Sequence, residues 1–210
     1  MLMLPEPLGR ALEAAGAKPL GQSDQTALPV RVICLSPSGR PFNQALAREL
    51  AAEKELILIC GRYEGIDQRI IDIYVDEEIS VGDYVLSSGE VAALALIDAT
   101  YRLVEQVINQ ASLDEESFDR LLLEYPQYTR PEIYATINAT LKVPEILLSG
   151  HHENIRRWRL ERRVEKTLAQ RPELIELGES RGLFDDETRK IIDTKRKAAY
   201  EWPSACQEEI

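Results

Sequence analysis

The feature that most constrains the fold is a repeated order of strand, loop and helix in the first half of the chain. Residues 30–35 (VRVICL) and 56–60 (LILIC) are short, wholly apolar runs, which are typical of strands buried in a parallel sheet. Each is followed by a loop and then by apolar residues at helical spacing, over residues 42–52 and 66–74. A third strand is predicted at 75–81. This order predicts an α/β fold with a parallel sheet.

Two further segments indicate how the chain is divided. Residues 91–107 are almost wholly apolar and predict a helix that is buried on most faces. Residues 108–117 (INQASLDEES) are polar and acidic, and we interpret them as a linker. We therefore expect an α/β domain at residues 1–107 and a small, mainly helical domain at residues 118–210.

Helix boundaries in the second part can be predicted from local signals. A helix is expected from about His152 to Gln170, because Arg171-Pro172 breaks the pattern. Another helix is expected to begin at Asp185, where acidic residues suit the positive end of the helix dipole and later basic residues suit its negative end.

Charge is distributed unevenly along the 210 residues. The chain has 36 acidic and 25 basic residues and a net charge of −11, which on its own argues against a nucleic-acid partner. Residues 151–210, however, contain equal numbers of acidic and basic residues, and the basic ones are clustered. The usual interpretation of such a cluster is a solvated helix face. Five arginines lie within eight residues: Arg156, Arg157, Arg159, Arg162 and Arg163.

The composition excludes several classes of site. His151 and His152 are the only histidines, which argues against Ser-His-Asp or Cys-His catalysis and against a multi-histidine metal site, so we expect no metal ligands. Three cysteines, Cys34, Cys60 and Cys206, are too few for a disulfide framework, and this fits a reducing cytoplasm. We expect Cys34 and Cys60 to be small buried apolar residues. No apolar run is long enough to span a membrane, and the first residues do not form a signal peptide.

Three loops follow the predicted strands, at residues 35–39, 61–67 and 80–90. In open parallel sheets, ligands bind beyond the carboxyl ends of the strands. Neither a GxGxxG fingerprint nor a P-loop motif occurs, so a standard dinucleotide or nucleotide site is not supported. One such loop alone would be an ordinary tight turn, but three together predict a composite pocket. The last two loops contain four glycines, which allow a ligand to approach the backbone: Gly61, Gly65, Gly82 and Gly89.

Five sequence blocks carry a resemblance to a known family. Residues 60–67 (CGRYEGID) and 80–90 (SVGDYVLSSGE) resemble the cofactor-binding signature of the bacterial tRNA (guanine-N1-)-methyltransferases, which belong to the knotted SPOUT class. Residues 124–132 (EYPQYTRPE), 147–152 (LLSGHH) and 155–163 (IRRWRLERR) are similar, in order, to the C-terminal domain of that family. The resemblance extends to about residue 200.

The resemblance implies transfer of a methyl group from S-adenosylmethionine to N1 of the guanosine at tRNA position 37, next to the anticodon. It also implies a trefoil knot, a homodimer with active sites built from both subunits, and a dependence on Mg²⁺. Carried over position by position, it implies that the three loops hold the cofactor, largely through backbone groups. The residues implied are Leu35, Ser36, Pro37, Gly61, Tyr63, Glu64, Gly65, Val81, Gly82, Asp83, Tyr84, Val85, Leu86 and Gly89.

The same resemblance implies two catalytic residues, Arg102 and Glu116. Guanine N1 carries a proton and is a poor nucleophile until a base such as the Glu116 carboxylate removes it. Negative charge then develops towards guanine O6, which a guanidinium such as that of Arg102 can stabilise. From sequence alone, Arg102 is also compatible with an ordinary helix residue whose charged end reaches solvent.

The target base must leave the anticodon-loop stack to be methylated. The five clustered arginines of residues 156–163 are then candidates for binding tRNA phosphates, and Trp158 or Tyr128 for stacking on bases. A core position for Trp158 is an equally good interpretation of its spacing.

The chain departs from the family pattern at several positions. The family has Asp where this chain has Glu116, and Gly-Gly where it has Ser88-Gly89. Relative to the family, we also expect an N-terminal segment with a strand to be missing before Met1. These departures leave an alternative open, namely a catalytically impaired fragment or paralogue that binds only tRNA or cofactor.

Overall fold

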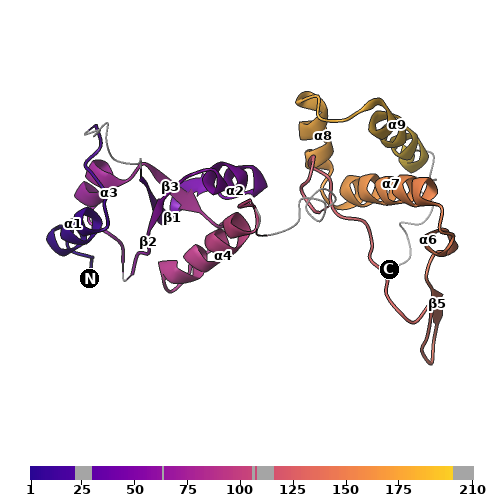
Figure 1. The fold of residues 1–210 in the computed structure, drawn as a ribbon, viewed down its shortest axis with the longest axis horizontal. Coiled ribbons are helices and arrows are strands. Elements are labelled where there is room, and N and C mark those ends of the chain that lie inside the picture. Colours follow the sequence, from indigo (N-terminus) through magenta and orange to yellow (C-terminus); the bar gives the residue numbers. More distant parts are fainter. Residues whose placement is uncertain (22–29, 63, 106, 108–115, 201–210) are drawn as a thin grey trace. The chain divides into compact units, whose positions relative to one another are not determined.

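The computed structural model describes residues 1–21, 30–62, 64–105, 107 and 116–200 (Figure 1). It divides into two compact units, Met1–Asn109 and Gln110–Ile210. No helix among the described residues is long and apolar enough to cross a membrane.

The first unit is built on a three-stranded parallel sheet with strand order β2-β1-β3. The strands are β1 (Arg31–Pro41), β2 (Leu56–Ile59) and β3 (Glu77–Ser80). Among the residues described in this unit, four helices accompany it, α1 (Pro5–Ala14), α2 (Gln44–Ala51), α3 (Gln68–Tyr74) and α4 (Gly89–Tyr101). The predicted α/β class with a parallel sheet is thereby confirmed.

The central strand β1 separates two apolar cores, because its side chains alternate between the faces of the sheet. Val32 and Cys34 belong to the core that contains α1 and α3, whereas Ile33 and Leu35 belong to the core that contains α2 and α4. Figure 1 shows these helix pairs on opposite sides of the sheet. Both faces of β1 are therefore buried, as its wholly apolar sequence predicts.

Strand β1 extends further than the sequence indicates. Its register with β3 shifts between Leu35 and Arg40, which both align with Ile79. The predicted loop at residues 35–39 is therefore a bulge inside the strand. Gly39 permits this return, since a Cβ there would lie 2.4 Å from the backbone C of Glu78 and the backbone N of Ile79.

The prediction of a helix at 91–107, buried on most faces, was wrong in extent and in burial. Helix α4 ends at Tyr101, and Arg102 is its half-buried C-cap. One face of α4 packs on the sheet through Ala92, Ala93 and Leu96. A second face of α4 is also apolar, but the first unit does not cover it. Its residues Val91, Leu94, Ile97 and Tyr101 are all exposed.

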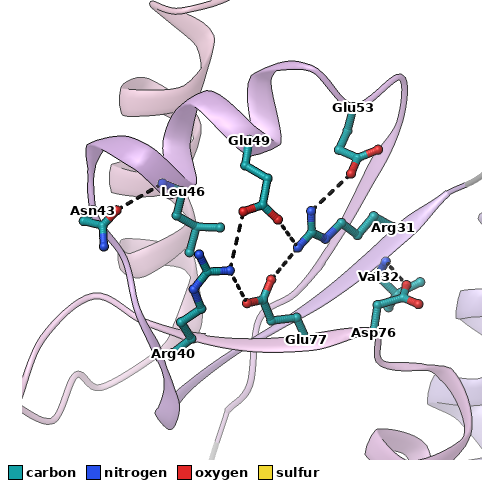
Figure 2. A network of polar contacts seen from close by, with 9 residues as sticks. All are labelled: Arg31, Val32, Arg40, Asn43, Leu46, Glu49, Glu53, Asp76 and Glu77. Atoms are coloured by element: carbon teal, nitrogen blue, oxygen red, sulfur yellow. Dashed lines mark hydrogen bonds and ion pairs between the residues drawn. The ribbon is translucent and has the colours of Figure 1, made fainter. Parts of the chain in front are cut away.

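A network of charged residues joins β1, β3 and α2 (Figure 2). Arg31 and Glu77 begin their strands, whereas Arg40 lies near the carboxyl end of β1. Arg31 donates to Glu49 at 2.8 Å, to Glu77 at 2.6 Å and to Glu53 at 3.1 Å. Arg40 donates to the other oxygens of Glu77, at 3.1 Å, and Glu49, at 3.5 Å. Burial would lower the pKa of Arg31, whose side chain is 19% exposed, but these hydrogen bonds raise it above its ordinary value.

Two side chains beside this network accept hydrogen bonds from backbone amides at the start of a helix and in a strand. Asn43 is the N-cap of α2 and accepts from the amides of Ala45 and Leu46, both at 3.0 Å. Asp76 accepts from the amide of Val32 at 2.8 Å. Figure 2 shows Asn43 at the start of the helix and Asp76 beside β1.

The second unit consists of a short hairpin and four helices among its described residues. The hairpin pairs β4 (Ile133–Ala135) with β5 (Thr140–Lys142), and the helices are α6 (Glu145–Leu148), α7 (His152–Gln170), α8 (Pro172–Ser180) and α9 (Asp186–Tyr200). The helix predicted from about His152 to Gln170 is confirmed, and Pro172 begins the next helix. The core of this unit lies between α7, α8 and α9 and contains Leu122, Val164, Ile175, Phe184 and Ile192.

We predict that Arg31→Met lowers the free energy of unfolding by about 2 kcal/mol at neutral pH, because it removes three charged hydrogen bonds and leaves Arg40 as the donor to Glu49 and Glu77. The hydrogen bond from Arg31 lowers the pKa of Glu49 below its ordinary value of 4.5. Stability from that shift is present above the pKa of the unfolded chain and is lost as pH falls through the folded value. The difference between variant and unaltered chain should therefore shrink on acidification. Urea denaturation at about pH 7 and about pH 3 measures both effects.

The matched control is Arg48→Met, an exposed arginine in the last turn of α2. An equal loss of stability in both variants would contradict a specific role for the network.

Candidate functional site

A cavity of about 650 Å³ lies in the first unit at the carboxyl ends of the strands. It is lined by the bulge of β1, by the loop after β2 and by the loop that leads from β3 into α4. The three segments that the sequence predicts to form a composite pocket therefore meet in one place, as strand order and parallel direction require.

Twelve of the fourteen residues predicted to hold a cofactor line this cavity. They are Leu35, Ser36, Pro37, Gly61, Glu64, Gly65, Val81, Gly82, Tyr84, Val85, Leu86 and Gly89. Asp83 is not among the lining residues. Tyr63 lies outside the residues that the structure describes.

Sequence reasoning missed several lining residues, among them Ser38, Arg62, Gln68 and Glu78. Ser38 and Arg62 lie inside the predicted loops at residues 35–39 and 61–67, and that position indicates that they line the cavity. Glu78 lies on β3, and its carboxylate accepts from the Ser38 hydroxyl at 3.3 Å. That contact joins two segments forty residues apart, and no local pattern indicates it.

The loop before α4 is held by its own polar groups. The Ser80 hydroxyl accepts from the Gly82 amide at 3.2 Å, and the Tyr84 hydroxyl donates to the Val81 carbonyl at 3.2 Å. Next to it, Arg62 and Glu90 form an ion pair at 2.9 Å. The Ser88 hydroxyl, the Glu90 amide and Arg62 together hold the pKa of the Glu90 carboxyl below its ordinary value.

The backbone at Gly89 closes the cavity on the side of α4. Its amide donates to the Gly61 carbonyl at 2.9 Å. A Cβ at Gly89 would lie 2.8 Å from the Cα of Cys60 and from the amide nitrogen of Gly61. The glycine is thus required by contact between two main-chain segments that both line the cavity.

The cysteines beside the cavity are not poised as nucleophiles. Burial raises the pKa of the Cys34 thiol to about 11, and burial likewise raises that of Cys60. A thiol of this kind stays protonated near neutral pH. Cys34 is buried, as predicted, whereas Cys60 is half-buried and Cys206 lies outside the described residues.

The two predicted catalytic residues belong to different units. Arg102 follows α4 in the first unit, and Glu116 is half-buried at the start of the described part of the second unit. Of the predicted linker, residues 108–115 lie outside the described residues.

The five clustered arginines of α7 have unequal surroundings. Arg156 is held by two carboxylates, Glu153 at 2.7 Å and Glu187 at 2.8 Å, whose hydrogen bonds raise its pKa. Arg157 is 67% exposed and pairs with Glu161 at 3.2 Å. The cluster is therefore not a uniform basic face.

Arg163 departs most from the prediction of a phosphate-binding residue. It is 7% exposed, and its guanidinium donates to backbone carbonyls within the second unit. A group with that burial is not available to a phosphate. Its place on the same helix face as Leu160, Val164 and Thr167 is the signal that identifies it as buried.

Aromatic residues lie against two other arginines of α7. The Arg159 guanidinium is 4.7 Å from the ring centroid of Tyr125, and that of Arg162 is 5.9 Å from Trp158. Trp158 also contacts Tyr128, with ring centroids 6.4 Å apart. Trp158 is half-buried and Tyr128 is 48% exposed, so these rings form a partly open surface.

No metal centre is evident in the part of the chain that the structure describes, because no three His, Cys, Asp or Glu residues are grouped there to hold an ion. His151 is the exposed N-cap of α7, next to His152 in its first turn.

In comparisons with known proteins, the family model and the relatives carry the same kind of name. Residues 1–177 match the family described as tRNA (Guanine-1)-methyltransferase TrmD. A tRNA (guanine-N(1)-)-methyltransferase of Treponema denticola is 56% identical over 192 residues, which cover 91% of this chain and 73% of the relative. One from Treponema pallidum is 49% identical over 203 residues (97% and 74%), and one from Borrelia turicatae is 52% identical over 193 residues (90% and 75%). All five blocks of the resemblance lie within the matched range.

We predict that Gly89→Ala lowers the free energy of unfolding by about 1–3 kcal/mol, because the added methyl group overlaps main-chain atoms that cannot yield independently. The gain in helix propensity, at most about 1 kcal/mol, acts in the opposite direction and is smaller. Gly61→Ala is the matched control, since its Cβ would meet only the Ile66 side chain, at 3.6 Å. Thermal denaturation compares them, and equal stability of the two variants would contradict the close approach.

Proposed function

Because this chain belongs to the tRNA (Guanine-1)-methyltransferase TrmD family, we propose that it transfers a methyl group from S-adenosylmethionine to N1 of the guanosine at tRNA position 37. The observation that carries the proposal is the 56% identity, over 91% of the chain, to a relative named tRNA (guanine-N(1)-)-methyltransferase. The alternative of a catalytically impaired fragment or paralogue is not favoured by identities of this size. A tRNA substrate implies a cytoplasmic location, and we propose it on that ground.

The cavity of the first unit suits the cofactor in size and lining. Its volume of about 650 Å³ falls in the range of small-molecule sites. Leu35, Val81 and Leu86 offer apolar contacts for a purine, and the glycine-bearing loops bring main-chain N–H and C=O groups to its surface. Two carboxylates, Glu64 and Glu78, also line it and favour a bound cation such as a sulfonium. Bound there, S-adenosylmethionine would supply the methyl group, and its sulfur would keep the electron pair of the broken C–S bond and leave as S-adenosylhomocysteine.

In this proposal, Glu116 and Arg102 act on the guanine. The Glu116 carboxylate accepts the N1 proton, and the N1 electron pair becomes available to bond the methyl carbon. The Arg102 guanidinium donates to O6, where negative charge develops, and so stabilises the transition state. The extra methylene of Glu116, relative to the family's Asp, alters the reach of the base by about 1 Å, a distance that affects rate strongly.

The proposed tRNA surface is narrower than the sequence indicates. Arg157, Arg159 and Arg162 remain candidates for phosphate contacts, and Tyr128 and Trp158 for stacking. Arg156 is offset by two carboxylates, so its contribution should be smaller. A need for Mg²⁺ rests on the resemblance alone and stays a prediction.

We also propose that the protein is a knotted homodimer, as the resemblance implies. The exposed face of α4 supports the dimer, because Val91, Leu94, Ile97 and Tyr101 form an apolar row of a kind that soluble helices rarely leave in water. A second copy of this chain would cover it.

Incubation of the purified chain with S-adenosylmethionine and unmodified tRNA bearing guanosine 37 should yield 1-methylguanosine, which nucleoside mass spectrometry detects. Glu116→Gln should reduce the single-turnover rate about 100-fold or more, because the amide cannot accept the N1 proton. Glu176→Gln, an exposed glutamate of α8, is the matched control. Absence of 1-methylguanosine with the unaltered chain would overturn the proposed function.

Leu94→Lys should convert the proposed dimer to a monomer in light-scattering measurements, because it introduces a charge at a side chain that is 67% exposed in the single unit. Leu20→Lys, at a leucine 48% exposed outside α4, should leave the mass unchanged. A monomeric unaltered chain, or a dimer that survives Leu94→Lys, would refute this interface.

A further inference from the structure

We propose that two buried polar residues of α7, Arg163 and Thr167, hold the turn that carries Glu116 and thereby position its carboxylate for removal of the guanine proton. The inference rests on the proposed function, in which Glu116 is the base. It assigns to Arg163 a positioning role within the second unit in place of phosphate binding.

Arg163 is tied to the backbone of this turn, residues 116–124. One terminal nitrogen of its guanidinium donates to the carbonyl of Asp119 at 3.1 Å and to that of Glu116 at 3.5 Å. Its Nε donates to the carbonyl of Leu123 at 3.4 Å. The Asp119 carboxylate lies 3.7 Å from the same guanidinium. Burying a charged group is costly unless it is paired, and here carbonyls of one turn and the Asp119 carboxylate are its partners.

Thr167 follows one helical turn later on the same face and is fully buried. Its hydroxyl donates to the Arg163 carbonyl at 2.7 Å and accepts from the Leu123 amide at 2.9 Å. Lys166, beside it, donates to the Glu124 carbonyl at 3.2 Å. Helix α7 therefore contacts the backbone of the turn at several points.

The turn needs such support because its own backbone is strained. Phe118, Arg120 and Leu121 have φ values of 71°, 47° and 60°, a left-handed region that side chains with a Cβ disfavour. Conformations of this kind persist where the surroundings determine them and are concentrated at functional positions. Hydrogen bonds from Arg163 and Thr167 hold the turn in this conformation from the side of α7. Leu122, which is 2% exposed, packs in the core and holds it there as well.

Glu116 lies where these restraints converge. Its carbonyl accepts from the Asp119 amide at 3.1 Å and from Arg163, and the next residue, Ser117, accepts from the Glu124 amide through its hydroxyl at 3.1 Å. The main chain that follows the proposed base is thus held by Arg163 and by hydrogen bonds within the turn. Loss of Arg163 or of the Thr167 hydroxyl releases that main chain, and a displacement of about 1 Å at a reacting group lowers a rate by up to about 100-fold.

The first measurement is amide hydrogen exchange, which does not depend on activity. In Arg163→Met and in Thr167→Val, the amides of Phe118, Leu122 and Leu123 should exchange at least about 10-fold faster, while the amides of α8 and α9 keep their protection. Thr167→Ser keeps the hydroxyl and should restore the protection. Exchange that stays unchanged in both variants overturns the proposal.

The second measurement is the single-turnover methylation rate as a function of pH. Arg163→Met should lower the rate about 10- to 100-fold near neutral pH. The deficit should shrink as pH rises, because solvent base removes the N1 proton more readily and a positioned carboxylate matters less. Affinity for tRNA should stay within about 2-fold of the unaltered chain, since the buried guanidinium does not face phosphates. A rate that is unchanged, or lowered by one factor at every pH, overturns the positioning role.

The matched controls remove similar groups that do not contact the turn. Thr194→Val removes a hydroxyl that makes the same helical bond, to the Lys190 carbonyl at 2.7 Å, and Arg181→Met removes an exposed arginine at the C-cap of α8. Both should leave exchange and rate unchanged. If the unaltered chain makes no 1-methylguanosine, the proposed function fails, and the exchange measurement alone decides whether α7 holds the turn.

Discussion

The structure of the first unit depends on β1, the central strand of its sheet. Both neighbouring strands pair with it, both apolar cores include its side chains, and it contributes residues to the charge network and to the cavity. Arg31 begins the strand and gathers three carboxylates, whereas Leu35 and the bulge that follows line the cavity. A strand buried on both faces cannot shift its register without exposing its core residues. The register of β1 therefore fixes the position of its residues that line the cavity.

Much of this arrangement could be predicted from local sequence. The apolar runs at 30–35 and 56–60 indicate buried strands, and parallel strands bring the loops after them to one edge, so twelve of fourteen predicted cofactor residues line one cavity. The loop glycines are predicted to let a ligand approach the backbone, and at Gly89 the structure gives a different reason for the glycine. Gly89 lies where two main-chain segments touch, and only a residue without a side chain fits there.

The features that could not be predicted depend on partners far away in sequence. The helix face of Arg163 indicates that its side chain is buried, but no local pattern indicates the carbonyls that its guanidinium contacts, which lie about forty residues earlier. The apolar sequence of α4 likewise does not tell which of its faces the sheet covers. In both cases the residue types indicate how apolar or charged a helix is. Which of its side chains are buried depends on the segments that pack against it.

The charge network and the cavity meet on strand β3. Glu77 pairs with Arg31 and Arg40, and the next residue, Glu78, lines the cavity. Successive side chains of a strand point to opposite faces of the sheet, so the two neighbours serve different surroundings although they are adjacent in sequence. For a lineage adapting to a new temperature or salt concentration, an exchange of these ion pairs is therefore constrained by the binding loops beside it.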